Sequence, residues 1–155
     1  MKSKLMGLLL VLPLLILQVT GAEPAGYKYW SAAELQSMSK PLANKNDAHT
    51  SNEALANFGP DHAMMIHRDA SGIAELHENE ADVIVVVSGA GTLIVGGSMP
   101  GSKSTAPGEM RAPEVVGGEK QKIGPGDILH IPPKVPHQVL VDGPQITYFV
   151  LKVKE

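Results

Sequence analysis

Short apolar segments, separated by glycine, proline and polar residues, fill the second half of the chain. Within residues 73–77 (IAELH), apolar and polar positions alternate from 74 on, whereas residues 83–87 (VIVVV) are continuously apolar. Alternation is typical of a strand with one buried face, and a continuous short run favours a strand buried on both faces. The segments predicted to be strands are 64–68, 73–77, 83–87, 92–95, 128–131, 138–141 and 146–153.

The connections between these segments have the composition of turns. Residues 69–72 (DASG) and 88–91 (SGAG) predict two turns. Residues 96–122 hold nine glycines or prolines and predict a long connection, with one short strand at 114–116. Because the strands follow one another without interleaved helices, the pattern indicates a sandwich or a barrel.

One helix is predicted before the strands. Ser31 and Glu34 have the spacing of a capping box, and Pro41 is expected to end the helix. Its apolar side consists of Ala32, Ala33, Leu35 and Met38. Residues 43–60 are polar and lack a period, so we expect a surface loop there.

The first residues predict an export signal. Lys2 and Lys4 precede a nearly unbroken apolar run over 5–19, and small residues follow it. The run is shorter than the ~20 residues of a spanning helix, so a signal peptide cleaved after Ala22 is favoured over a retained membrane anchor. The predicted organisation is a signal peptide over 1–22, a helix and loop over 23–60 and one β domain over 61–155. The mature protein is then secreted or periplasmic.

Composition excludes several classes of function. The chain has no cysteine, so neither disulfides nor thiol chemistry contribute. Its 13 Lys and Arg against 16 Asp and Glu give a net charge of −3, and no basic run is present. We therefore expect no nucleic-acid partner, and no membrane association after cleavage.

Two segments carry side chains capable of chemistry. Glu75 and His77 are two residues apart in a predicted strand and share one face of it. The segment 126–137 (GDILHIPPKVPH) predicts a strand that ends in a proline-rich turn, which brings His137 to the start of the next strand.

The first segment resembles the first motif of the cupin superfamily, which has two His one residue apart, then a Glu, then a Gly. Counting back from Gly89 without gaps puts Asp82 at the position of the family's Glu, His77 at the second His and Glu75 at the first. An alternative alignment, with a two-residue deletion, makes His77 the first His and Asn79 the second. Both versions keep their candidates on one strand face.

The segment 126–137 resembles the second cupin motif. It matches at Gly126, Pro132 and His137, with Lys134 in place of a glycine. The resemblance covers about residues 60–153. It implies an all-β, jelly-roll barrel with one short N-terminal helix. An exposed edge strand in such a barrel needs cover, which favours a homodimer.

The resemblance also implies a metal site formed by His77, Asp82 and His137, with Glu75 as a fourth ligand or a general base. Two imidazoles and a carboxylate suit non-haem Fe(II), which is our first choice. Nitrogen and oxygen donors also suit Mn²⁺, Ni²⁺, Cu²⁺ and Zn²⁺. The alternative is that no metal binds and that the histidines only form hydrogen bonds inside the barrel.

His130 and Arg68 are further candidates. His130 precedes the proline-rich turn, and it serves as an acid or base if it faces the barrel interior. Arg68 contacts a substrate only if its strand turns that residue inward. The leading function is a metal-dependent enzyme, of the dioxygenase type, for a small organic molecule. The alternative is an exported, non-catalytic protein that binds a small ligand such as a sugar.

Overall fold

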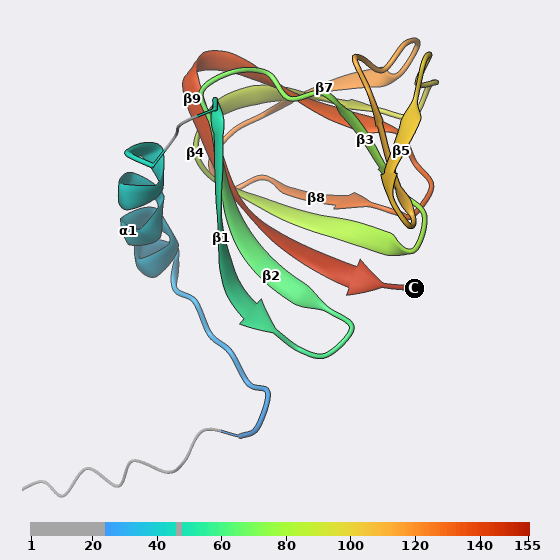
Figure 1. The fold of residues 1–155 in the computed structure, drawn as a ribbon. Helices are drawn as coiled ribbons and strands as arrows, with labels where there is room; N and C mark the ends of the chain where they lie inside the picture. The colour runs from blue at the N-terminus through green and yellow to red at the C-terminus, as the bar shows by residue number, and fades with distance from the viewer. Residues whose placement is uncertain (1–23, 46–47) are drawn as a thin grey trace, which may run out of the picture.

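A computed structural model describes residues 24–45 and 48–155. The predicted signal peptide, 1–22, lies outside these residues. The described residues form one helix and a single curled antiparallel sheet (Figure 1). The elements are α1 (Ala32–Ala43), β1 (Thr50–Asn57), β2 (His62–Arg68), β3 (Ala74–His77), β4 (Glu80–Val95), β5 (Lys103–Ala106), β6 (Glu109–Ala112), β7 (Glu119–Ile123), β8 (Ile128–Ile131) and β9 (His137–Lys154).

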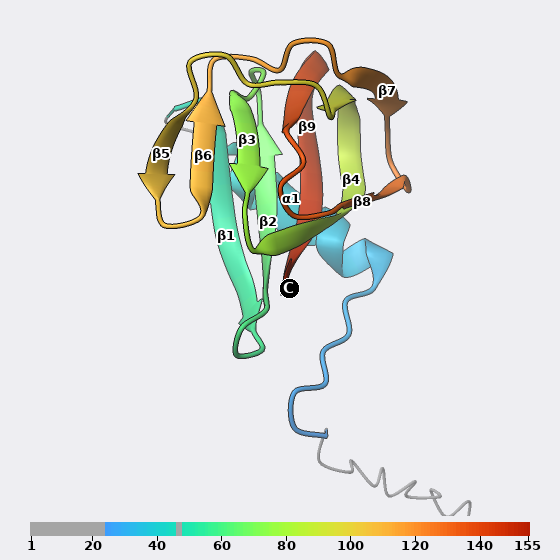
Figure 2. The same cartoon turned by 90° about the vertical axis from the view of Figure 1, so that its right-hand side faces the viewer.

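Two long strands, β4 and β9, organise the sheet. One path of hydrogen-bonded neighbours runs β1-β2-β9-β3-β6-β5, and β4 pairs with β9, β7 and β8. β4 and β9 pair along nearly their whole lengths, and the sheet curls around the space between them and β3 (Figures 1 and 2). The prediction of an all-β fold with one short N-terminal helix is confirmed.

The turn predicted at 88–91 is wrong, because the chain continues through it as one strand. The pairing of β4 with β9 shifts register between Val86 and Ser88 and again between Gly89 and Gly91. Such bulges bend a strand sharply without ending it. Gly89 has a φ of 80°, and a Cβ there would collide with the carbonyl of Gln145. The segments 138–141 and 146–153 are likewise joined in the single strand β9.

Two segments predicted to be connections contain strands. Residues 50–57 form β1, where we expected a loop, and residues 96–122 include β5, β6 and most of β7. Four of the eight residues of β1, and all four of β5, are exposed. These strands are held mainly by backbone pairing with a neighbour, so their sequences carry no apolar alternation that would reveal them.

Helix α1 begins as predicted and ends later than predicted. The Ser31 hydroxyl accepts a hydrogen bond from the Glu34 amide, and Glu34 accepts one from the Ser31 amide, which completes the capping box. The helix continues past Pro41 to Ala43. Leu42, which is 1% exposed, packs against the sheet and keeps the last turn in place.

The sheet buries different side chains on its two faces. On the outer face, Met65 and Val87 pack with Leu42 of α1. On the inner face, an apolar cluster centred on Ile84, Val86 and Ile146 fills one end of the barrel. Polar side chains gather at the other end. Within the described residues, no helix has the length and hydropathy of a membrane-spanning segment.

Candidate functional site

A cavity of about 330 Å³ lies inside the barrel, beside the apolar cluster. Strands β1, β2, β3, β4, β6 and β9 all contribute side chains to its wall. The four residues predicted to form the site all line it: Glu75, His77, Asp82 and His137. A volume near the lower end of the range for ligand pockets suits a small molecule.

Strand register explains why these residues meet. Glu75 and His77 share one face of β3, and Glu75 is the cross-strand partner of His137, the first residue of β9. The proline-rich turn before His137 is tied to β3, because the Lys134 amide donates to the His77 carbonyl at 2.7 Å. Lys134 occupies the position of the motif glycine, and its φ of 65° lies in the left-handed region that favours glycine.

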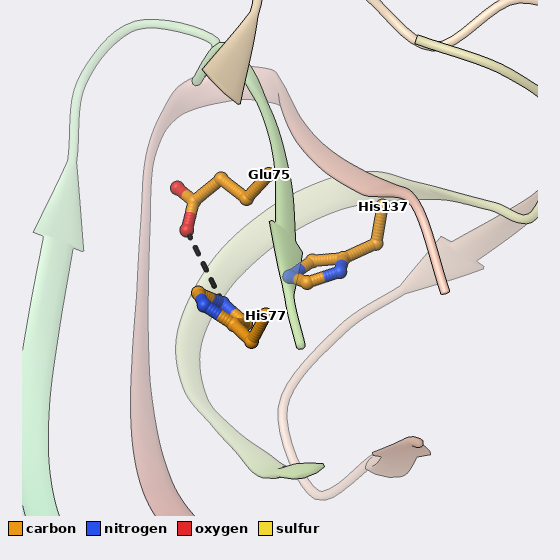
Figure 3. Close-up of side chains that lie close together, drawn as sticks. All are labelled: Glu75, His77 and His137. Atoms are coloured by element: carbon orange, nitrogen blue, oxygen red, sulfur yellow. Dashed lines mark ion pairs between the residues drawn. The ribbon is translucent and has the colours of Figure 1, made fainter. Parts of the chain in front are cut away.

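The potential metal ligands converge. Glu75, His77 and His137 each offer one ligand atom, and these atoms lie within 4.8 Å of one another (Figure 3). Asp82 joins the two histidines, since its Oδ2 is 3.6 Å from His77 Nε2 and 3.5 Å from His137 Nε2. His77, Asp82 and His137 are all buried. This group is close enough and of the right chemical type to hold an ion.

Glu109 orients His77, and the sequence analysis missed it. Its carboxylate is 2.8 Å from His77 Nδ1, and Arg111 contacts the same carboxylate at 2.8 Å. Burial alone would raise the pKa of Glu109, but the hydrogen bonds and charges of His77 and Arg111 outweigh burial and lower it. Glu109 lies in the predicted connection 96–122, and only the β3–β6 register, which pairs it with His77, brings it to the site.

Lys152 is the second residue that the sequence analysis missed. Its Nζ lies 2.7 Å from His77 Nε2 and 2.6 Å from Asp82 Oδ1. Since Nδ1 of His77 faces a carboxylate and Nε2 faces an ammonium, the ring proton belongs on Nδ1 and the Nε2 lone pair accepts from Lys152. Lys152 shares one face of β9 with Tyr148 and Val150, but the other face of this strand is also apolar in sequence, so periodicity alone does not tell which face turns inward.

Arg68 occupies the wall of the cavity, where it is bound to protein groups. It donates to the Tyr148 hydroxyl at 2.9 Å, to Thr50 Oγ1 at 3.0 Å and to Glu75 Oε1 at 3.0 Å. Burial raises the pKa of the Tyr148 hydroxyl, which therefore stays protonated. Arg68 thus faces inward, as a substrate contact would require, and it fixes one oxygen of Glu75.

Asp82 is the most strongly perturbed acid of the site. Burial acts to raise its pKa, but the contact with His137 and the positive charge of Lys152 outweigh burial and lower the pKa to about 2. Asp82 Oδ1 is buried and has no partner with good hydrogen-bond geometry. The negative charge of Asp82 is compensated instead by the Lys152 ammonium, which forms an ion pair with Oδ1 at 2.6 Å.

The donor set therefore fits a metal in type and spacing, but Lys152 already occupies part of it. Two imidazoles and two carboxylates are suitable ligands. However, the Lys152 ammonium already uses the Nε2 lone pair of His77 and contacts Asp82. An ion bound to His77 and Asp82 would have to displace Lys152 first.

The structure does not bring the two remaining candidates to the cavity. His130 is exposed on β8 and lies outside the cavity wall. Asn79 is exposed just after β3, with its side chain near Gly108. Of the two alignments of the first motif, the ungapped one selects the residues that meet in the cavity.

Comparison with known proteins identifies the fold. No family model matches the chain, and no curated protein does. Solved structures match about 70% of it. Among them are KdgF from Halomonas sp. (17% identity, TM-score 0.52, 83% of that chain), the cupin domain of Cnp3 from Schizosaccharomyces pombe (7%, 0.53, 67%) and a double-stranded β-helix protein from Klebsiella pneumoniae (14%, 0.52, 79%). The chain has the cupin fold, as its two motifs predicted.

The buried ion pair predicts a large effect of Asp82→Asn on stability. This variant leaves the Lys152 ammonium buried without a counter-charge, so the free energy of unfolding falls by about 3 kcal/mol. The matched control is Asp142→Asn, since Asp142 pairs with the exposed Lys122 at 2.8 Å and its loss changes stability little. Urea unfolding at neutral pH measures both. Equal midpoints for the two variants would contradict the prediction.

The ion pair of Asp82 with Lys152 also determines how the stability of the protein changes with pH. The Asp82 pKa falls from 3.8 to about 2 on folding, so its stabilising contribution is complete above pH 3.8 and is lost as the pH falls toward 2. The Asp82→Asn variant has no carboxylate to protonate at this position, so its stability does not include this pH-dependent contribution. The difference between the unfolding free energies of wild type and variant should therefore shrink over that window.

Proposed function

We propose that this protein binds a small polar organic molecule in the barrel cavity and acts on it with the side chains around His77. The observation that carries the proposal is the convergence of two histidines and several charged groups on one cavity of about 330 Å³. Elsewhere the barrel interior is apolar. Fold alone does not define an activity, so the proposal depends on these side chains.

The side chains that line the cavity favour a ligand without net charge. Met64, Ile66 and Val139 supply apolar contacts. The cations Arg68, Arg111 and Lys152 each contact a carboxylate of the same wall. Because these charges already compensate one another, a ligand rich in hydroxyl or carbonyl groups, such as a sugar, suits the cavity better than a strongly charged one.

An acid–base chain runs through His77. Its Nδ1–H donates to Glu109, and its Nε2 accepts from Lys152. A carboxylate behind an imidazole fixes the tautomer and stabilises the protonated ring. Because both ring nitrogens are occupied, His77 would exchange a proton with a bound molecule through Lys152, whose ammonium donates to Nε2. Glu75 Oε2, 3.7 Å from His77 Nε2, is the second candidate for this role.

Filling the cavity should abolish ligand binding. Met64→Trp adds bulk to the wall without touching an ion pair, and we expect it to weaken binding by at least about tenfold. His130→Ala, outside the cavity, is the control and should bind as the wild type does. Calorimetry against neutral monosaccharides and polyols measures this. Unchanged binding by Met64→Trp would place the ligand elsewhere.

Turnover separates an enzyme from a pure binding protein. If His77 moves a proton, His77→Gln should retain the ligand while the rate falls by about 10²–10⁴-fold. The readout is product formation followed by NMR with the ligand found in the binding screen. A wild-type protein that binds this ligand and leaves it unchanged would be the non-catalytic binder of our second hypothesis.

A metal-dependent oxidoreductase of the dioxygenase type is a further candidate, favoured by the convergence of Glu75, His77 and His137. Fe(II) is the first metal to test, followed by Mn²⁺, Ni²⁺, Cu²⁺ and Zn²⁺. This candidate requires an ion to displace Lys152 from His77 and Asp82. If it is right, the wild type consumes oxygen in the presence of its substrate after anaerobic loading with Fe(II), and His137→Ala does not. Failure of the wild type to bind any of these metals at micromolar concentration near neutral pH would exclude this candidate.

Export is proposed from residues 1–22, which lie outside the described residues. The basic start, the apolar run and the small residues before Glu23 support it. Mass spectrometry of the secreted or periplasmic protein should find Glu23 at its N-terminus. Recovery of the intact chain from membranes would contradict the proposal. The predicted homodimer also stays a prediction, which sedimentation of the mature protein can measure.

A further inference from the structure

Lys152 lies among the side chains that would hold a metal ion. Its Nζ is 2.6 Å from Asp82 Oδ1 and 2.7 Å from His77 Nε2. These are contacts that an ion ligated by Asp82 and His77 would need for itself. Lys152 is 8% exposed, so its ammonium has little water to compensate it.

The backbone enforces this position. Lys152 and Asp82 are cross-strand partners in the pairing of β9 with β4. Residues 148, 150 and 152 all line the cavity, as one face of a strand must. A rotation of the lysine side chain therefore leaves its Cβ on the inner face, directly opposite Asp82, where opposite charges attract.

Each cation of the cavity wall is already paired with a carboxylate without a metal. Three contacts pair a cation with a carboxylate: Arg68 with Glu75, Arg111 with Glu109, and Lys152 with Asp82. Glu80 is the remaining carboxylate of the wall. A divalent ion would place two further positive charges beside a buried ammonium, and that repulsion is strong at a site screened from water.

The lone pairs of His77 also indicate that Lys152 and a metal ion compete for the same position. His77 Nδ1 is directed at Glu109, so Nε2 is the nitrogen left to bind an ion. Lys152 uses that lone pair. A metal and the ammonium thus require the same atom of His77, and one excludes the other.

We propose that Lys152 is the resident cation of this site and that it excludes divalent metals from the Glu75, His77 and His137 group. The inference deepens the proposed function, because it identifies which cation faces the small molecule in the same cavity. The bound molecule then meets an ammonium that can donate hydrogen bonds, where a metal-loaded site would present open coordination positions.

The test is to remove the ammonium and measure metal affinity. Co²⁺ is titrated into the full chain, and its visible absorption reports coordination by protein ligands. Lys152→Met keeps the bulk of the side chain and should bind Co²⁺ at least about tenfold more tightly than the wild type. Lys154→Met is the matched control, since Lys154 is exposed at the end of the same strand, and it should match the wild type. Adding His137→Ala to Lys152→Met should remove the gain.

A folded Lys152→Met protein that binds Co²⁺ no more tightly than the wild type would overturn the inference. A measurement on the wild type covers the case in which this variant does not fold. A buried, hydrogen-bonded lysine ammonium exchanges its protons slowly enough to give a resolved ¹⁵N-edited NMR signal. If Zn²⁺ stays out of the site, the lysine signal should remain in the presence of excess Zn²⁺. If Zn²⁺ displaces Lys152 from the site, the signal should disappear. A signal that persists while Zn²⁺ shifts the ring resonances of His77 and His137 would show simultaneous occupancy and refute the inference.

The two proposals fail separately. If Lys152→Met gains Co²⁺ affinity while the wild type binds no small molecule, the inference stands and the proposed function fails. If the wild type binds its ligand in the cavity and Lys152→Met gains no affinity, the proposed function stands and the inference fails.

Discussion

The antiparallel pairing of β4 with β9 is the constraint on which the rest of the molecule depends. Its bulges near Gly89 bend both strands, so one pair of strands forms the apolar end of the barrel and also one wall of the cavity. The same register puts Asp82 opposite Lys152. A slip of either strand by one residue would turn its own member of this pair to the outer face and separate the two charges.

The sequence was informative where burial imposed a pattern. The alternation and apolar runs located the inner strands, and the capping box at Ser31 located the start of the helix. The two motifs indicated the cupin fold, and the spacing between Glu75, His77 and Asp82 selected side chains that the fold gathers in one cavity. In each case a local rule, such as strand parity or helix capping, agrees with the tertiary structure.

The sequence was uninformative where a role depends on a distant register. Glu109 lies in a polar, glycine-rich stretch, and nothing local marks it as the partner of His77. Lys152 near the end of the last strand reads as an ordinary solvent-exposed lysine, since its inward position depends on which face β9 turns toward β4. His130 is the converse case, in which the local sequence suggested a role and the tertiary structure does not bring the residue to the cavity. Its proximity in sequence to the second motif suggested a role, but β8 leaves it on the surface.

The hairpin formed by β5 and β6 has an importance that its surface position does not suggest. β5 ends the strand path and is exposed throughout, whereas β6 pairs with β3 and buries Ala112 in an apolar cluster. β6 also carries Glu109, the carboxylate that holds the proton of His77 on Nδ1. Removal of this carboxylate would leave Lys152 on Nε2 as the remaining polar partner of the ring. A strand at the rim of the barrel therefore contributes to the fixed orientation of an imidazole in the interior.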